Sequence, residues 1–247
     1  MNFGKYPSVV LTLIWFSSFC LLPVLLWQGY FLRRAALRLP EAGPPNSGRF
    51  CSSETEMMIV GVGDSVIAGT GIGSLSNSVT ARVAQTLASR FSTGVNWLAR
   101  GISGAKLEDL LARLKEEPLP GADIYLVSIG VNDVTGMTSL ARWQLQVSEL
   151  VTLLDERALI LILGVPPMQH FAVIPWPLRQ VLGVRAALLD KTFSQAAETV
   201  ERVIWFDTSI NFDRAYLARD GYHPNEEACV EIASKIVDSL ILYREAA

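Results

Sequence analysis

Short apolar runs alternate with longer stretches of helical spacing over most of the chain, from about residue 57 onward. In the longer stretches, apolar residues recur every three or four positions, which is typical of helices that bury one face. Strands that alternate with helices favour a parallel sheet covered by helices on both faces. The pattern therefore predicts a three-layer α/β protein with a five-stranded parallel sheet. Its strands are expected at residues 57–62, 95–99, 123–129, 159–164 and 203–207.

The first 38 residues follow a different pattern. The stretch between Lys5 and Arg33 holds no charged residue and is mostly apolar. An apolar helix of about 20 residues is long enough to cross the hydrocarbon core of a bilayer. Trp27 and Tyr30 lie near the end of the run, where aromatic side chains often meet the lipid headgroups. We therefore predict a transmembrane helix that makes residues 1–38 an N-terminal membrane anchor.

Two other interpretations of this segment stay open, a cleaved signal peptide and a buried core helix. The apolar stretch is longer than the usual core of a signal peptide, and Arg33, Arg34 and Arg38 follow it where cleavage requires small residues. These features favour an uncleaved anchor. Lys5 alone precedes the run, so the basic residues slightly favour a cytoplasmic position for the rest of the chain.

The segment after the anchor is rich in residues that favour turns and extended chain. Residues 39–48 include three prolines and two glycines. We predict a linker over residues 39–55 and one globular domain over residues 56–247. Half of the 247 residues are hydrophobic, so this domain can bury a sizeable core.

Charge and cysteine content restrict the possible functions. All 24 acidic residues lie after residue 38, against 17 of the 21 basic residues, so this part has a formal charge of −7. An anionic domain binds the phosphate backbone poorly, and nucleic acid is not expected as a partner. The three cysteines have no metal-ligand or redox spacing. A disulfide between Cys51 and Cys229 stays open at this point.

Small, polar and titratable residues follow the predicted strands. They form four short segments: 63–65 after the first strand, 100–104 after the second, 130–133 after the third, and 220–225 in the loop after the fifth. In parallel sheets, ligands bind beyond the carboxyl ends of the strands. We therefore expect the four segments to meet at one end of the sheet and to form an active site there.

The residue types in these segments point to nucleophilic catalysis. A serine attacks an ester only when a base takes its proton, and this base is usually an imidazole oriented by a carboxylate. The chain has two histidines, His170 and His223, and Asp220 lies three residues before the second. Ser65 with Asp220 and His223 would suffice for this chemistry. The Asp-x-x-His pair alone is equally consistent with a surface turn.

Taken together, the four segments resemble the conserved blocks of the SGNH, or GDSL-type, serine hydrolases, in the same order along the chain. The blocks are Gly63-Asp64-Ser65 with Gly69, then Gly101-Ile102-Ser103-Gly104, then Gly130-Val131-Asn132-Asp133, and finally Asp220-Gly221-Tyr222-His223-Pro224. The resemblance covers about residues 57–243. It implies a flavodoxin-like α/β/α fold and hydrolysis of carboxylic esters.

The resemblance also implies a role for each residue. Ser65 is expected to be the nucleophile, His223 the general base and acid, and Asp220 the group that orients the imidazole. The oxyanion hole is expected to consist of the backbone N–H groups of Ser65 and Gly104 and the side-chain amide of Asn132. Asn132 suits this role because its amide is a neutral donor that does not titrate near pH 7.

Three further positions in these blocks have other expected properties. Asp64 and Asp133 are expected to brace their turns rather than to take part in the chemistry. In many relatives an asparagine lies two residues before the first glycine of the second block, and this chain has Ala99 there. A hydrogen bond that steadies the loop is therefore expected to be missing.

The loop after the fourth strand, residues 166–178, is long and rich in Met, Phe, Ile, Trp and Pro. Loops of this kind often form lids or binding walls. We consider Met168, Phe171 and Trp176 as substrate-binding residues, which would fit an acyl chain. The alternative is that these side chains pack as ordinary core. His170 in the same loop is expected to pack or to lie at the surface.

No cofactor is indicated by the remaining motifs. The glycine pattern after the first strand lacks the third glycine of a dinucleotide-binding turn, and no phosphate-binding loop occurs. Two distant histidines make a zinc site improbable.

The sequence therefore predicts a membrane-anchored serine hydrolase that cleaves acyl esters of a small molecule or a lipid through an acyl-serine intermediate. Alternatives are a carbohydrate deacetylase or acyltransferase with the same site, and a catalytically silent binding domain on a tether. Because many relatives act outside the cytoplasm, a periplasmic or otherwise extracytoplasmic domain is the alternative to the orientation that the charges favour.

Overall fold

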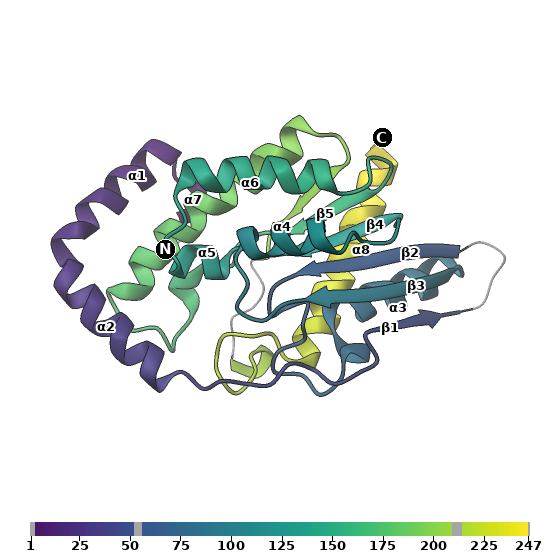
Figure 1. Ribbon diagram of the computed structural model, residues 1–247, viewed down its shortest axis with the longest axis horizontal. Helices are drawn as coiled ribbons and strands as arrows, with labels where there is room; N and C mark the ends of the chain where they lie inside the picture. Colours follow the sequence, from purple (N-terminus) through teal and green to yellow (C-terminus); the bar gives the residue numbers. More distant parts are fainter. Residues whose placement is uncertain (1–2, 52–55, 209–213, 247) are drawn as a thin grey trace.

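The computed structural model describes residues 3–51, 56–208 and 214–246 of the chain. They form a six-stranded sheet with helices on both faces (Figure 1). The strands are β1 (Ser47–Phe50), β2 (Glu56–Gly63), β3 (Gly94–Gly101), β4 (Ile124–Ser128), β5 (Leu159–Leu163) and β6 (Val203–Phe206). The helices are α1 (Ser8–Ser17), α2 (Leu22–Ala35), α3 (Val79–Phe91), α4 (Leu107–Glu116), α5 (Val131–Thr135), α6 (Leu140–Leu153), α7 (Leu178–Thr199) and α8 (Glu226–Ala246). Short 3₁₀ turns are η1 (Phe3–Lys5), η2 (Ser18–Leu21), η3 (Leu75–Asn77), η4 (Met168–His170) and η5 (Arg214–Tyr216).

The five strands predicted from the apolar runs are all present, as β2 to β6. They are parallel and lie side by side in the order β3-β2-β4-β5-β6, which is the flavodoxin-like order. The three-layer parallel α/β fold is therefore confirmed. The sheet has one strand more than predicted, because β1 pairs antiparallel with β3 at the edge.

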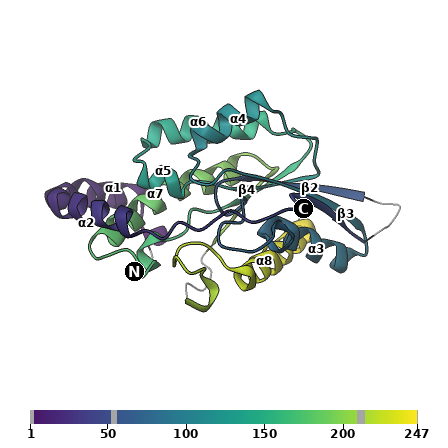
Figure 2. The ribbon, with the colours of Figure 1, turned by 60° about the horizontal axis from the view of Figure 1, so that its bottom comes forward.

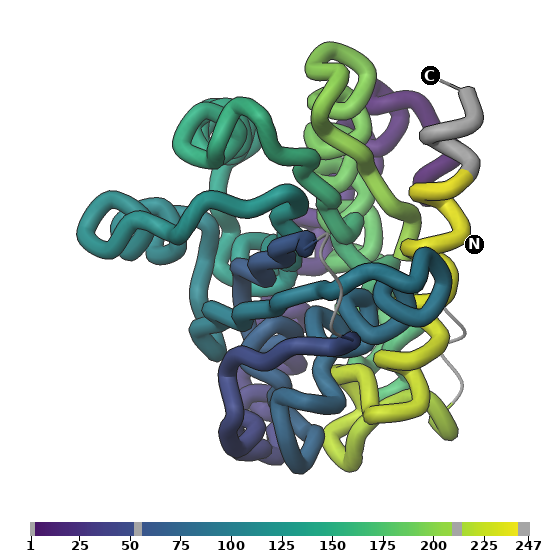
Figure 3. The backbone as a smooth tube through the Cα atoms, turned by 90° about the vertical axis from the view of Figure 1, so that its right-hand side faces the viewer, coloured from purple at the N-terminus to yellow at the C-terminus, as the bar shows by residue number. Residues whose placement is uncertain are grey.

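Alternate residues of the strands face two separate hydrophobic cores, because successive side chains of a strand point to opposite faces. Val60 of β2 and Val127 of β4 face the core under α4, α6 and α7. Ile59 and Leu126, their neighbours along the chain, face the core under α3 and α8. Figures 2 and 3 show these helix layers on opposite sides of the sheet. Burial on both faces explains why the strands read as nearly continuous apolar runs.

The extra strand lies in the segment predicted as a linker. Ser47 of β1 pairs with Leu98 of β3, and Phe50 pairs with Val95. The residues just before β1 are also bonded to the domain, since Ala42 N–H donates to the carbonyl of Ala68 at 3.1 Å. Residues 39–46, which we call the strap, thus run along the domain before β1 enters the sheet.

The N-terminal residues form an apolar arm that consists of α1, η2 and α2 (Figure 1). At one end of the arm, Leu11 is fully buried among side chains of α7 that include Val184 and Leu188. At the other end, the Gln28 side chain donates to the carbonyl of Trp176 at 2.8 Å and accepts from the N–H of Leu178 at 3.1 Å. Most side chains between these contacts are exposed.

Candidate active site

The turn that carries Ser65 follows β2, the strand at which the sheet order reverses. Ligands of parallel α/β sheets bind at this point, because the loops on its two sides lead away from each other. Asp64 fixes the turn, since its N–H donates to the carbonyl of Ser128 at 2.9 Å and its carboxyl accepts from the N–H of Val66 at 3.1 Å. The expected bracing role of Asp64 is confirmed, and Ser65 is left half-buried at the end of the sheet.

Asp64 has an unusual protonation equilibrium because it is only 2% exposed. Burial raises the pKa of its carboxyl to about 7, with a smaller contribution from the nearby carboxylate of Asp133. The hydrogen bond from Val66 and the charge of His223 act in the opposite direction but do not cancel the effect of burial. Asp64 therefore titrates near neutral pH, although it makes no hydrogen bond to the Ser65 hydroxyl among the described residues.

Ser65, His223 and Asp220 form a continuous hydrogen-bonded chain. The Ser65 Oγ lies 2.8 Å from Nε2 of His223, and Nδ1 of His223 lies 2.6 Å from Oδ2 of Asp220. A neutral imidazole that donates its Nδ1 proton to Asp220 presents the Nε2 lone pair to the serine hydroxyl. This geometry suits the transfer of the serine proton to the imidazole.

Asp220 is held in the charged form that this arrangement needs. Burial by itself would raise its pKa, but hydrogen bonds from the His223 ring and from the N–H groups of Tyr222 and His223 lower the pKa below the usual value. The side chain of Asp220 is 3% exposed, whereas that of His223 is 23% exposed. The carboxylate is thus shielded behind the imidazole, and the imidazole faces the open side of the site.

The position of His223 is fixed by backbone contacts on both sides. Its carbonyl accepts from the N–H of Ala218 at 2.8 Å. Two residues further on, the side chain of Asn225 caps α8 by accepting from the N–H of Ala228 at 2.9 Å. The histidine therefore lies in a short turn that leads directly into the first turn of a long helix.

The three expected oxyanion donors come from three of the loops. Among the described residues, the N–H groups of Ser65 and Gly104 make no hydrogen bond to protein, which leaves them free for a ligand. Gly104 is exposed and has φ +80°, a conformation that favours glycine, and no atom lies within 4 Å of the place that a Cβ would occupy. The amide of Asn132 donates to the carbonyl of Ala105 at 2.9 Å, which fixes its orientation and leaves its second N–H for a substrate oxygen.

The loop of Gly104 packs closely on the loop of Ser65. A Cβ on Gly101 would lie 2.0 Å from the N atom of Ala68, so only glycine permits this approach. Asp133 supports the same region from the next loop, because it accepts from the N–H of Leu107 at 3.0 Å and from the hydroxyl of Thr138 at 2.7 Å. The bracing role expected for Asp133 is therefore confirmed.

The apolar loop 166–178 packs against the turn of Asp220 and His223. The rings of Phe171 and Tyr222 lie 5.8 Å apart. Met168 and Phe171 are both almost fully buried in the hydrophobic core, which is the alternative that the sequence left open for them. Trp176 differs, since it is 69% exposed and lies next to the N-terminal arm. Its part in substrate binding stays a prediction.

The other residues considered from the sequence lie outside this cluster. His170 lies at the surface in η4, as expected. Cys51 is exposed, Cys229 is buried in α8, and neither forms a disulfide. Within the described ranges, no three His, Cys, Asp or Glu side chains come together in a way that could hold a metal ion.

One contact at this site was not predicted from the sequence. The carboxylate of Glu41 in the strap accepts from the backbone N–H of Ser103 at 3.0 Å. Glu41 lies 62 residues before Ser103 in a segment that reads as a linker, so no local pattern indicates the contact. The loop that begins after Ala99 is thus held by a hydrogen bond to a distant part of the chain.

Comparison with known proteins agrees with this arrangement. The model of the GDSL-like lipase/acylhydrolase family matches residues 62–228. A search of curated proteins finds no match. Solved structures share the fold at low sequence identity. A lipase from a goat rumen metagenome is 17% identical, with a TM-score of 0.59 over 74% of this chain and 96% of that chain.

Two more solved structures have a similar fold. A lipase/acylhydrolase from Enterococcus faecalis is 18% identical, with a TM-score of 0.58 over 74% of this chain and 95% of that chain. An acetyl xylan esterase from Geobacillus stearothermophilus is 20% identical, with a TM-score of 0.53 over 76% of this chain and 94% of that chain. The family match spans more than half of the chain and includes all four motif blocks up to the start of α8. The chain therefore belongs to the GDSL-like lipase/acylhydrolase family and is an ester hydrolase.

Proposed function

We propose that this protein is a membrane-anchored serine hydrolase that cleaves carboxylic acyl esters through an acyl-serine intermediate. The observation that carries the proposal is the hydrogen-bonded chain from Ser65 through His223 to Asp220, with donor–acceptor distances of 2.8 and 2.6 Å. Both distances are within the range in which a proton passes between the groups.

In the first step, the Ser65 Oγ attacks the carbonyl carbon of the ester and its proton moves to Nε2 of His223. Negative charge then develops on the former carbonyl oxygen. The N–H groups of Ser65 and Gly104 and the second N–H of Asn132 are the donors that stabilise this charge. Asp220, whose pKa is lowered, stays ionised and stabilises the imidazolium.

The intermediate collapses when the bond to the alcohol oxygen breaks and His223 returns the proton to the departing alcohol. Water then attacks the acyl-serine, His223 takes a proton from this water, and the acid is released while Ser65 regains its proton. The side chain of His223 is 23% exposed, so the alcohol can leave and the water can enter next to the imidazole.

The first test is a series of p-nitrophenyl esters of increasing acyl length, hydrolysed by the full chain in detergent micelles. We expect the Ser65→Ala and His223→Ala variants to lose turnover by a similar factor. Both residues take part in the same step, so the loss of either one removes the nucleophilic attack. Melting temperatures close to that of the wild type would show that the variants are folded. Near-normal turnover by purified Ser65→Ala protein would contradict the mechanism.

A second candidate function uses the same residues on an acetylated sugar or transfers the acyl group to another alcohol. The structural similarity to an acetyl xylan esterase is the observation that favours it. Assays with acetylated xylan fragments and with an added alcohol acceptor distinguish the three outcomes by their products. Free acetate, free longer-chain acid and a new ester identify the deacetylase, the acyl hydrolase and the transferase, respectively.

A binding domain without catalytic activity is disfavoured by the geometry. Such a domain has no need for an ionised, buried Asp220 aligned with His223 and Ser65, nor for the two unbonded N–H groups beside them. The ester series decides this alternative as well, because a silent domain would show the same background rate before and after substitution of Ser65.

The N-terminal arm is the proposed membrane anchor. Among the residues that the structure describes, one helical segment is long and apolar enough to cross a membrane, the 28 residues Ser8–Ala35, whose most apolar 18-residue window has a mean hydropathy of 2.4. Only 11% of its most apolar window is buried, so it does not resemble a core helix. Trp27 and Tyr30 are exposed within the two helical turns before Arg33, which suits a boundary between lipid and water.

The orientation of the anchor is a separate question. One basic residue before the span and three after it favour a cytoplasmic catalytic domain, and the alternative is export. Carboxyl-terminal fusions to one reporter that works only in the cytoplasm and to another that works only after export test this. We expect activity of the cytoplasmic reporter, and activity of the exported reporter alone would reverse the assignment.

A further inference from the structure

The loop that supplies Gly104 is exposed and depends on few contacts. Ile102, Ser103 and Gly104 are all exposed at the open end of the sheet. Ala105 N–H donates to the carbonyl of Ile102 at 3.1 Å, and the carbonyl of Ala105 accepts from Asn132 at 2.9 Å. These bonds fix the carboxyl-terminal side of the loop. On the amino-terminal side, the N–H of Ile102 donates to the carbonyl of Gly63 at 2.9 Å and the hydroxyl of Ser103 lies 3.3 Å from that of Thr70. The backbone N–H of Ser103, next to a glycine at φ +80° with a wide choice of conformations, needs an acceptor of its own.

Glu41 supplies a support on that side. Its Oε1 atom accepts from the backbone N–H of Ser103 at 3.0 Å. The next peptide group consists of the Ser103 carbonyl and the Gly104 N–H, which the proposed mechanism directs at the substrate oxygen. Because a peptide group is planar, holding the Ser103 N–H fixes the group from Ile102 to Ser103, and the next group can then turn only about the two backbone bonds of Ser103. A carboxylate acceptor makes this a charge-assisted bond, which is stronger than a neutral one.

The backbone of Glu41 is held in place by hydrogen bonds of its two neighbours in the strap. The carbonyl of Pro40 accepts from the N–H of Gly71 at 3.3 Å, and the N–H of Ala42 donates to the carbonyl of Ala68 at 3.1 Å. Both partners lie in the turn that follows Ser65. The strap therefore connects two of the loops that provide oxyanion donors, and Glu41 reaches the second loop beside the contact of 3.3 Å between the hydroxyls of Thr70 and Ser103.

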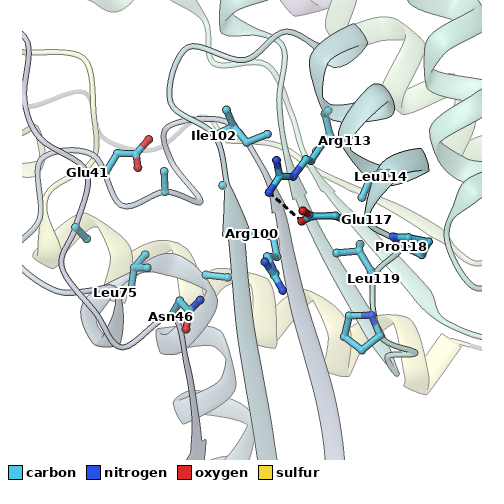
Figure 4. Close-up of a pocket in the computed structure, with 16 residues that line it drawn as sticks. Glu41, Asn46, Leu75, Arg100, Ile102, Arg113, Leu114, Glu117, Pro118 and Leu119 are labelled. Carbon is cyan, nitrogen blue, oxygen red and sulfur yellow. Dashed lines mark ion pairs between the residues drawn. The ribbon is translucent and has the colours of Figure 1, made fainter.

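The surroundings of Glu41 show that its contact with the loop is specific. A cavity of about 400 Å³ lies beside the loop, and Glu41 and Glu117 line it from opposite sides (Figure 4). Glu117 is paired with Arg113 at 2.9 Å. Two carboxylates thus face one cavity, and within the described part of the chain only Glu41 accepts a hydrogen bond from the Ser103 N–H. Glu117 therefore provides a matched control.

We infer that Glu41 is a positioning residue for catalysis, which orients the Gly104 N–H by holding the N–H of Ser103. This inference rests on the proposed function, since it assumes that Gly104 is an oxyanion donor. A donor that is misdirected in the free enzyme stabilises the transition state less but does not change ground-state binding much. The effect of losing Glu41 is therefore expected in kcat rather than in KM.

The experiment compares Glu41→Ala, Glu41→Gln and Glu117→Ala in the full chain in detergent micelles, with a short p-nitrophenyl ester. We expect Glu41→Ala to lower kcat about tenfold with little change in KM, since a loosened donor should cost less than the 10²–10³ expected for a lost one. Glu41→Gln keeps a carbonyl oxygen for the Ser103 N–H and should recover most of kcat. Glu117→Ala should match the wild type.

A readout at the serine separates positioning from general damage. The fraction of enzyme that a fluorophosphonate labels at Ser65 gives the number of competent sites, and kcat is expressed per labelled serine. If Glu41 only stabilises the fold, Glu41→Ala will lower the melting temperature and the labelled fraction but not kcat per labelled serine. That result, or a Glu41→Gln variant as slow as Glu41→Ala, would overturn the inference.

Two reference variants keep this inference distinct from the proposed function. If Ser65→Ala retains turnover, the proposed function itself fails. If Ser65→Ala is inactive and Asn132→Ala has a lowered kcat while Glu41→Ala equals the wild type, the mechanism stands and only the role of Glu41 is refuted.

Discussion

Asn132 shows how one side chain can be fixed and still available for a substrate. Its amide donates one hydrogen bond to the carbonyl of Ala105 at 2.9 Å, and this bond sets the direction of the second N–H. Asn132 lies in the first turn of α5, directly after β4, the third of the strands predicted from the sequence. The side chain is therefore pre-oriented before substrate binds, which is the condition for strong oxyanion stabilisation.

We predict that Asn132→Ala lowers kcat by about 10²–10³, the range expected for the loss of one oxyanion donor. The ground-state affinity should change much less, because the bond strengthens only when charge develops on the oxygen. Steady-state kinetics with a soluble ester measure both quantities. A steep rise in KM at constant kcat would mean that Asn132 binds the substrate and not the transition state.

Asp64 leads to a prediction about stability and pH. Its pKa in the folded protein is about 7, compared with 3.8 for an unperturbed carboxyl. The folded state therefore holds a proton that the unfolded state releases, and the resulting stability is lost as the pH rises through 7. A shift of this size corresponds to a loss on the order of 4 kcal/mol between pH 4 and pH 8.

The variant Asp64→Asn removes this titration but keeps an oxygen that can accept from the N–H of Val66. We expect the melting temperature of the wild type, measured relative to that of Asp64→Asn, to fall as the pH is raised from 5 to 8. Asp190 also has a raised pKa, but both proteins share it and its effect cancels in the difference. Asp133 interacts with the charge of Asp64, so the measured difference reports on this pair of carboxyls. If the difference between the two melting temperatures does not change with pH, Asp64 is already ionised at pH 5.

At the scale of elements, the close approach of the loops after β2 and β3 constrains the site. Gly101 lies where a Cβ would be 2.0 Å from the backbone of Ala68, whereas Gly104 has open space around the same position. The two glycines belong to one motif block and are three residues apart. They nevertheless serve different purposes, close packing at Gly101 and a left-handed conformation at Gly104.

We predict that Gly101→Ala is much more damaging to the fold than Gly104→Ala. The first substitution must push the two loops apart, and the turn of Ser65 would move with them. The second carries only the cost of a left-handed alanine, about 1–2 kcal/mol. Thermal unfolding of both variants measures the difference. Equal melting temperatures would indicate that the loops can separate without strain.

The elements that the sequence predicts well are those buried on both faces. The strand β4 (Ile124–Ser128) is fully buried, and four of its five residues form a continuous apolar run in the sequence. By contrast, β1 has the sequence Ser-Gly-Arg-Phe and alternates between exposed and half-buried residues at the edge of the sheet. Such a strand has too little apolar content to differ from a linker, so it could not be recognised from pattern alone.

The site follows the same rule. The order of the four motif blocks could be read from the sequence because the first three blocks lie at the ends of strands with a clear apolar pattern and the fourth directly precedes the last helix. The contact between Glu41 and Ser103 could not be predicted from the sequence, because it depends on the route of the strap between α2 and β1. Burial of Met168 and Phe171 was also left open, since an apolar loop reads alike whether it lines a pocket or fills the core.

At the scale of the whole molecule, the apolar arm is the feature that most affects where the enzyme works. Its central part is exposed, while Leu11 near one end and Gln28 near the other contact the domain. Exposure of so many apolar side chains to water is unfavourable, and a surrounding bilayer removes this cost. Cys20 lies in the middle of the arm, and Cys51 lies just after β1; both are exposed in the absence of lipid.

These two cysteines allow a test within the native chain. We predict that a water-soluble maleimide labels Cys51 but not Cys20 when the protein is in membranes, because lipid covers the arm. Cys20→Ser and Cys51→Ser variants assign the label, and the buried Cys229 should stay unlabelled until the protein unfolds. Rapid labelling of Cys20 in intact membranes would contradict anchoring by this segment, as would its loss from the mature protein by cleavage.

The strap also limits how far the catalytic domain can move from the N-terminal arm, and thus from a bilayer that the arm would enter as the proposed anchor. Four residues separate the end of α2 at Ala35 from Pro40, which is already hydrogen-bonded to the turn after Ser65. Even fully extended, this length of chain reaches at most about 18 Å. If the arm is the anchor that we propose, so short a tether would keep the enzyme from searching the surrounding solution for distant polymers. Its substrates would have to come to the lipid surface or already reside there, and two copies would meet only by diffusion in the plane of the membrane.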